Sequence, residues 1–139
     1  MDYREIAKDM FSLMIKGESN IKKSFEDIDL LNLVKIRASQ INHCSFCLDM
    51  HTEEALKRGE SAQRIFALKT WQQSDLFTEK ERAALHLVES LTLLSFDTPK
   101  EDLLDELKKH FSDKDIVYLV YATTYINSWN RLNIFLRKD

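Results

Sequence analysis

The sequence contains very little glycine and proline. Two glycines and one proline stand among its 139 residues, whereas β-sandwiches and β-barrels need many tight turns, in which these two residue types predominate. Leucine, lysine, glutamate and alanine, which favour helices, are frequent instead. The composition therefore predicts an all-α protein.

The sequence also has no long apolar run and no strong excess of one charge. No apolar stretch approaches the roughly 18 residues of a membrane-spanning helix, and the N-terminal residues lack the pattern of a secretory signal peptide. The 20 lysines and arginines are dispersed among 23 acidic residues, without the basic patch that nucleic acids or anionic membranes attract. We therefore expect a cytoplasmic protein that binds neither nucleic acid nor membrane.

The spacing of apolar residues predicts a compact bundle of six to eight helices in one domain over residues 1–139. A chain of this length, 44% hydrophobic, can bury one core, and no repeat or flexible linker divides it. The first helix begins near Tyr3 and is expected to end at Gly17, followed by a polar connection over residues 19–27. Further helices are expected over residues 28–41 and 45–58, and from residue 62 to an end near residues 72–75.

Capping signals mark the starts of the later helices. Thr78 and Glu81 have the S/T-x-x-E spacing of a capping box. Thr98 followed by Pro99 indicates a second start of this kind, with proline at the first helical position. Ser112 is expected to begin a long last helix that reaches about Leu136.

The chain has only two cysteines, Cys44 and Cys47, and a histidine follows the second after four residues, at His51. On a helix, positions 0, 3 and 7 fall within roughly 60° of arc, so the three side chains share one face. Residues three apart have Cβ atoms about 5 to 6 Å apart, close enough for a disulfide. Because so small a ring adds little stability, we interpret the pair as a redox-active dithiol.

Two other interpretations of these residues remain open. Cys44 and Cys47 together with His43 and His51 could bind zinc, although structural zinc sites usually combine two ligand pairs that are distant in sequence. The thiols could also be buried and inert. We favour redox chemistry, and we expect neither a metal nor a cofactor.

Several stretches resemble the AhpD-like alkylhydroperoxidase and carboxymuconolactone decarboxylase superfamily. The core of the resemblance is the run Arg37 to His51, which reads RASQINHCSFCLDMH. Later landmarks follow in the order that the family has. They are Ala55, Gly59, Glu60, Trp71, the run 81–85 and the run 126–132.

The resemblance implies an AhpD-like fold, assembly as a homo-oligomer and the reduction of hydroperoxides in antioxidant defence. By this analogy Cys47 attacks the peroxide, Cys44 resolves the sulfenic acid into an intramolecular disulfide, and His51 relays protons. A dithiol or a protein reductant would then reduce the disulfide.

The chain departs from the family pattern at two positions. Related sequences commonly carry a glutamate twelve residues before the first cysteine, where this chain has Asn32, and the best-studied peroxidases have a histidine in place of Phe46. We expect another carboxylate to substitute for the glutamate. Glu54, on the same helical face as His51, and Glu81, on a neighbouring helix, are the candidates.

Three further polar residues could line or orient the site. Gln40 and Asn42 come just before the thiols and could either cap the helix junction or line the pocket. Asn130, near the end of the last helix, is expected either to hydrogen-bond another helix or subunit or to lie beside the active site.

Two functions compete with the peroxidase. The same disulfide could serve a non-enzymatic redox sensor or interaction module. Alternatively, the loss of relay groups at Asn32 and Phe46 could mark a ligand-binding scaffold whose cysteines are residual.

Overall fold

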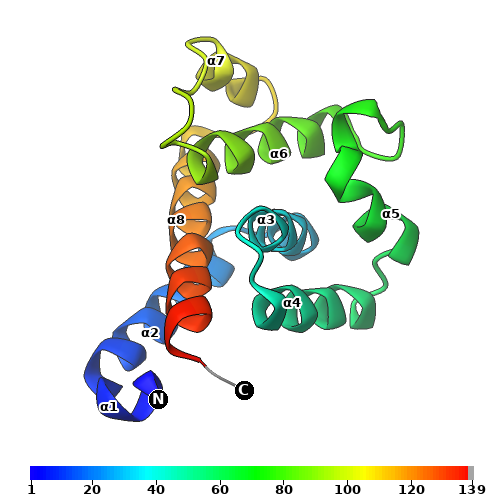
Figure 1. Cartoon of the computed structure of the whole chain (residues 1–139). Coiled ribbons are helices and arrows are strands. Elements are labelled where there is room, and N and C mark those ends of the chain that lie inside the picture. The colour runs from blue at the N-terminus through cyan, green and yellow to red at the C-terminus, as the bar shows by residue number, and fades with distance from the viewer. Residues whose placement is uncertain (138–139) are drawn as a thin grey trace.

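Helix α3 (Ile28–Ile41) lies at the centre of the fold, and Figure 1 shows it almost end-on with the other helices around it. Nine of its fourteen residues are buried. Around it lie, in chain order, α4 (Ser45–Lys57), α5 (Ala62–Ala67), the 3-10 helix η1 (Leu68–Gln73), α6 (Glu79–Thr92) and α8 (Asp113–Leu136).

The remaining helices cover the outside of this arrangement. The N-terminal helices α1 (Tyr3–Ile6) and α2 (Lys8–Ser24) lie near the C-terminal half of α8, and α7 (Leu103–Lys108) packs against α6 and α8. The structure is a computed structural model that describes residues 1–137, and within this range it contains eight α-helices and no strand. The predicted all-α fold of six to eight helices is therefore confirmed. No helix in this range is long and apolar enough to cross a membrane.

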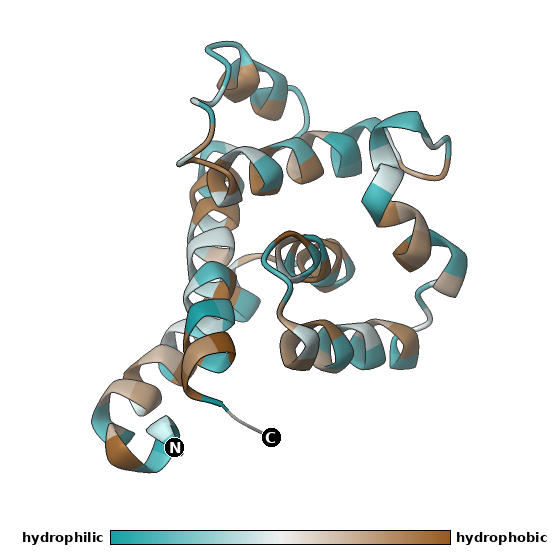
Figure 2. Ribbon diagram, viewed as in Figure 1, coloured by the Kyte–Doolittle hydropathy of each residue, from teal (hydrophilic) through white to brown (hydrophobic). Residues whose placement is uncertain are grey.

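The hydrophobic core forms where α6 and α8 face α3. Figure 2 shows hydrophobic residues at intervals along these helices. Leu85 and Val88 of α6 and Leu119 and Ile126 of α8 are completely buried. Since burying each such side chain contributes about 1.5 to 3 kcal/mol, these contacts hold the central helix in place.

Most of the predicted helix boundaries are confirmed. Thr78 and Glu81 make both hydrogen bonds of the capping box at the start of α6, and Ser112 caps α8 through its side chain. Helix α3 has the predicted bounds, and α4 ends at Lys57, just before Gly59, whose φ of 96° suits glycine.

Two boundary predictions are wrong. Helix α2 passes through Gly17 and continues to Ser24, well into the expected connection over residues 19–27. Glycine is needed there because a Cβ atom would collide with the ring of Tyr125 in α8. Pro99 does not begin a helix, because α7 starts only at Leu103 and has no side-chain cap.

Candidate active site

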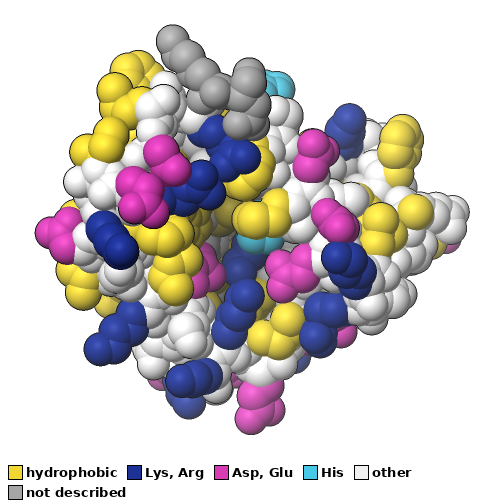
Figure 3. Space-filling model, turned by 90° about the horizontal axis from the view of Figure 1, so that it is seen from below, with side chains coloured by type: hydrophobic (Ala, Val, Ile, Leu, Met, Phe, Trp, Pro, Cys, Tyr) yellow, Lys and Arg dark blue, Asp and Glu magenta, His cyan; other side chains and the backbone are white. Residues whose placement is uncertain are grey.

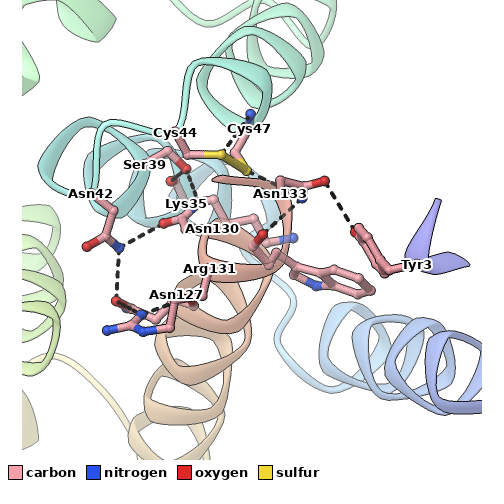
Figure 4. The surroundings of a disulfide bond; sticks show 11 residues. Tyr3, Lys35, Ser39, Asn42, Cys44, Cys47, Asn127, Asn130, Arg131 and Asn133 are labelled. Atoms are coloured by element: carbon pink, nitrogen blue, oxygen red, sulfur yellow. Dashed lines mark hydrogen bonds between the residues drawn. A yellow bond between two sulfur atoms is a disulfide. The ribbon is translucent and has the colours of Figure 1, made fainter. Parts of the chain in front are cut away.

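The two cysteines lie at the turn between α3 and α4. His43 adopts a left-handed backbone conformation, with φ of 57°, and reverses the chain there. Cys44 is the N-cap of α4, and its Sγ accepts a hydrogen bond of 3.4 Å from the backbone N–H of Cys47. The two Cα atoms are 5.4 Å apart and the sulfurs form a disulfide (Figure 4). The predicted pairing of Cys44 with Cys47 is therefore present.

The two cysteines differ in their position relative to the cavity that His51 lines. Cys44 and Cys47 are 2% and 1% exposed, but Cys47 lines a cavity of about 300 Å³, whereas Cys44 is absent from its wall. A reactant that enters the cavity therefore meets Cys47 first.

The cavity wall combines apolar side chains with charged ones. Figure 3 looks onto this face of the molecule, where the surface is hollowed and a histidine and charged side chains lie between hydrophobic ones. The apolar lining is Phe11, Ile15, Phe46, Met50 and Trp129. The charged lining is Arg4, Glu18, Lys22, Lys35 and Glu54.

His51 lies one turn of α4 beyond Cys47 and lines the same cavity. Burial lowers its pKa from the ordinary 6.5 to about 4; the nearby positive charge of Lys35 adds to the shift, while Glu54 and Glu18 oppose it. The imidazole is therefore neutral at neutral pH in the disulfide form. Its Nδ1 atom is buried without a hydrogen-bond partner, 3.7 Å from Oε2 of Glu54.

Lys35 and Glu18 add a buried ion pair to the cavity. The Lys35 side chain is 2% exposed, and its Nζ lies 3.2 Å from Oε2 of Glu18. The other carboxylate oxygen of Glu18 accepts a hydrogen bond of 3.0 Å from the indole N–H of Trp129. Neither residue was predicted from the sequence, although a lysine at a core position of the most apolar predicted helix is a signal that could have indicated Lys35.

A chain of polar side chains ties α8 to the α3–α4 turn. Asn42 donates through Nδ2 to the side-chain oxygens of Asn127 and Asn130, at 3.0 and 2.9 Å. Asn130, fully buried, donates to Oγ of Ser39, which in turn donates to the backbone carbonyl of Lys35 (Figure 4). Asn42 and Asn130 thus hold the helix junction together and are not part of the cavity wall.

Asn133, one turn further along α8, reaches the disulfide itself. Its Nδ2 lies 3.7 Å from Sγ of Cys47 and 2.9 Å from the backbone carbonyl of Trp129. Its Oδ1 accepts a hydrogen bond of 3.2 Å from the hydroxyl of Tyr3. Both residues line the cavity, and the sequence offered no local signal for either.

Of the two carboxylates expected to replace the missing glutamate, only Glu54 lies at the cavity. It also pairs with Lys22, at 3.7 Å. Glu81 lies away from the cavity. Its carboxylate binds Arg64 and closes the capping box with Thr78.

Three other residues that the sequence analysis singled out are also placed by the structure. Gln40 accepts a hydrogen bond from Arg37 and lines a separate groove beside α4 and α5. Asn32 is buried in α3, with its Nδ2 unpaired. Phe46 lines the cavity, with the guanidinium carbon of Arg137 3.7 Å from its ring centroid.

The described residues bring together no set of side chains that could bind zinc. Within residues 1–137, no group of three or more histidine, cysteine, aspartate and glutamate side chains is arranged to hold a metal ion. The bond between Cys44 and Cys47 also occupies both sulfurs.

Known sequences support the resemblance to the carboxymuconolactone decarboxylase superfamily. The model of the Carboxymuconolactone decarboxylase family matches residues 29–90, a range that contains both cysteines and His51. The uncharacterized protein YdfG of Bacillus subtilis is 39% identical over 134 residues, 96% of this chain and 91% of that protein. The uncharacterized protein YnjA of Escherichia coli is 30% identical over 120 residues, 86% of this chain and 65% of that protein.

Two solved structures share the fold. A protein of unknown function from Agrobacterium tumefaciens, described as a candidate antioxidant defence protein AhpD, superposes with a TM-score of 0.94 at 34% sequence identity, over 100% of this chain and 95% of that one. The apo debrominase Bmp8 superposes with a TM-score of 0.82 at 18% identity, over 97% and 73%. The second likeness concerns the fold alone.

Proposed function

The chain belongs to the carboxymuconolactone decarboxylase family, and we propose that within it this protein is a thiol-dependent peroxidase of the AhpD type. The observation that carries the proposal is the disulfide-bonded pair of Cys44 and Cys47, of which Cys47 opens onto a cavity beside His51. A pair that is buried except toward a cavity suits a reaction with a small molecule better than a structural crosslink.

The proposed reaction has two steps at the sulfurs. In the first, the Cys47 thiolate attacks the outer oxygen of a hydroperoxide, the O–O bond breaks, and an alcohol leaves after taking up a proton, so that Cys47 becomes a sulfenic acid. In the second, the Cys44 thiolate attacks this sulfur and the disulfide forms with release of water. A dithiol then reduces the disulfide by exchange and becomes oxidised itself.

His51 is the proposed proton carrier of both steps. A neutral imidazole can accept the proton of the Cys47 thiol, and the negative charge of the resulting thiolate favours the imidazolium form. The imidazolium can then protonate the departing alkoxide. The position of His51 on the same cavity as Cys47 supports this role.

The cavity supports organic hydroperoxides as substrates. Phe11, Ile15, Phe46, Met50 and Trp129 offer apolar contact for an alkyl or aryl group. Charged side chains at the same wall can bind the peroxide oxygens. The reductant is proposed to be a dithiol or a protein with a dithiol that can reach Cys47.

Homo-oligomeric assembly belongs to the same proposal. Ile6, Met10 and Leu13, at the N-terminal end of the chain, are 72%, 56% and 61% exposed. Apolar side chains exposed together are typical of protein contact sites. Sedimentation or light scattering of the purified protein tests this point.

The decisive experiment is peroxide turnover by the purified chain. We expect cumene hydroperoxide to convert the two thiols of the reduced protein into one intramolecular disulfide, and a small dithiol to sustain many turnovers. Cys44→Ser should leave a sulfenic acid on Cys47 that dimedone traps, whereas Cys47→Ser should yield none.

The outcomes separate the competing functions. Thiols that persist after exposure to peroxide would refute the proposal and favour the ligand-binding scaffold. The redox sensor would be favoured if each protein molecule consumed one peroxide, a dithiol did not sustain further turnover, and the oligomer size changed on oxidation. Ser45→Ala, which removes an exposed hydroxyl between the two cysteines, is the matched control and should retain activity.

A further inference from the structure

We propose that Asn133 activates Cys47 by donating a hydrogen bond to its sulfur, and that Tyr3 positions the Asn133 amide for this purpose. The inference rests on the function proposed above, which it extends by one catalytic residue and one positioning residue. Both come from segments outside the cysteine motif, at the two ends of the chain.

The two sulfurs have donors of different origin. Cys44 accepts from the backbone N–H of Cys47 within its own turn of α4, at 3.4 Å. Cys47 instead accepts from a side chain of α8, the Asn133 amide, at 3.7 Å. The sulfur that faces the cavity therefore depends on tertiary structure for its donor.

The hydrogen bonds around Asn133 determine which end of its amide faces the sulfur. The backbone carbonyl of Trp129 can only accept, so the atom 2.9 Å from it is the NH₂ group, Nδ2. The Tyr3 hydroxyl donates to the opposite end, Oδ1, at 3.2 Å. With one contact on each end, the amide has a single favourable orientation, and it directs the second N–H toward Cys47 (Figure 4).

The bond gains strength when the disulfide is reduced. A thiolate carries a full negative charge, and hydrogen bonds to ionised acceptors are about twice as strong as neutral ones. Stabilising the thiolate lowers the pKa of the thiol. Tyr3, by donating to Oδ1, keeps the amide aligned and polarises it further.

The test is the pKa of the Cys47 thiol, measured from thiolate absorbance near 240 nm. The Cys44→Ser background leaves Cys47 as the one thiol that titrates. Asn133→Ala should raise this pKa by about one unit, because one charge-assisted donor is lost. Asn133→Asp, which keeps the shape but places a carboxylate beside the sulfur, should raise it further. Tyr3→Phe should raise it by less than half as much as Asn133→Ala.

Peroxide kinetics provide the second readout, in the chain with both cysteines. One unit of pKa reduces the thiolate fraction about tenfold near neutral pH, but the more basic thiolate is about threefold more nucleophilic. We therefore expect Asn133→Ala to slow the oxidation of the reduced protein about three- to fourfold. Tyr121→Phe is the matched control: it removes an exposed hydroxyl from α8 away from the cavity and should change neither value.

The order of the pKa shifts distinguishes the proposal from a merely structural role. A Cys47 pKa that rises from wild type through Tyr3→Phe and Asn133→Ala to Asn133→Asp supports it. Equal values in the wild type, Asn133→Ala and Asn133→Asp would overturn it. If Asn133→Ala fails to fold, the Cys47 pKa measured in the isosteric Asn133→Asp variant and in the Tyr3→Phe variant still tests the proposal.

The failure of this inference is separate from the failure of the proposed function. Unchanged pKa values in a protein that consumes peroxide remove the role of Asn133 alone. A protein that does not react with peroxide removes the peroxidase, whatever the pKa values are.

Discussion

Two clusters of buried charge in this molecule differ in how completely they are paired. Around Arg64, the guanidinium binds Glu60, Glu81 and the backbone carbonyl of Leu76. Around the cavity, Lys35 pairs with Glu18, yet the nearby His51 keeps a buried nitrogen without a partner. The first cluster ties α5 to the start of α6, and the second surrounds an open cavity beside Cys47.

The charge states of the two clusters differ accordingly. Burial raises the pKa of Glu81, but the hydrogen bonds from Arg64 outweigh it and hold this pKa below its ordinary value. For His51, the carboxylates of Glu54 and Glu18 raise the pKa too little to offset burial and the charge of Lys35, which leave the imidazole neutral. A cluster in which every charged group has a hydrogen-bond partner stabilises the fold. A cluster beside a cavity that leaves the imidazole of His51 without a partner keeps this group available for proton transfer.

The largest effect is expected from breaking the ion pair at the cavity. Lys35→Met leaves Glu18 without its cation in a largely buried place, which costs about 3 kcal/mol of unfolding free energy. Denaturant unfolding at pH 7 measures the loss. Adding Glu18→Gln in a double variant should restore most of it, because no uncompensated charge then remains. A loss below about 1 kcal/mol in the single variant would show that solvent already screens the pair.

Acid should destabilise the cavity cluster through His51. Its folded pKa of about 4 lies below the ordinary 6.5, so between these values the unfolded chain binds a proton that the folded chain does not. Stability should therefore be complete above pH 6.5 and fall by about 3 kcal/mol as the pH drops to 4.

The comparison between the wild type and His51→Gln isolates this contribution. Other titrating groups are common to both proteins, so the difference between their unfolding free energies should decrease from pH 6.5 to pH 4. A difference that does not vary with pH would contradict the neutral, buried state of His51. At pH 7 the variant should also consume peroxide about 100-fold more slowly, as expected for the loss of a general acid–base.

Removing the centre of the satisfied cluster should lower stability and leave the chemistry intact. Arg64→Ala removes hydrogen bonds to two half-buried carboxylates and one carbonyl and should cost about 2 kcal/mol. Thermal unfolding measures the cost, and the Cys47 thiol pKa is the companion measurement. A shifted thiol pKa in this variant would show that the two clusters are coupled and do not act independently.

The smallest effect should come from the cap that adjoins the satisfied cluster. Thr78→Ala removes the hydroxyl that accepts a hydrogen bond from the backbone N–H of Glu81 in the capping box of α6. The loss should lower the free energy of unfolding by about 1 kcal/mol. Thr78→Ser, which keeps the hydroxyl, is the control and should unfold almost like the wild type. Equal losses in both variants would assign the cost to the missing methyl group instead.

The parts of the fold that the sequence predicted correctly depend on interactions within one turn of chain. The capping box at Thr78, the cap at Ser112 and the stop before Gly59 are all of this kind. The failure at Gly17 has the opposite cause, whereas nothing in the structure explains why the helix begins at Leu103 and not at Pro99. Gly17 permits the approach of Tyr125 from another helix, and no local pattern shows that a glycine inside a helix serves such a contact.

The residues of the candidate site also fall into two groups, those related by spacing in the sequence and those brought together only by tertiary contacts. Cys47 and His51 lie on α4 and Cys44 is its N-cap, so their spacing in the sequence was enough to group them. Lys35, Glu18, Tyr3 and Asn133 come from four other helices, and no spacing relates them to the cysteines. Glu81 was a reasonable candidate by sequence, but the structure pairs it with Arg64.

The sequence was sufficient to predict the helical class, the main helix starts and the close approach of Cys44 to Cys47. These properties follow from backbone hydrogen bonds and the 3.6-residue period, which act over a few residues. That Cys47 and not Cys44 faces the cavity, and that Asn133 and Lys35 line it, follows from tertiary packing. Burial of apolar faces brings distant helices together, and it is this packing that selects the neighbours of each sulfur.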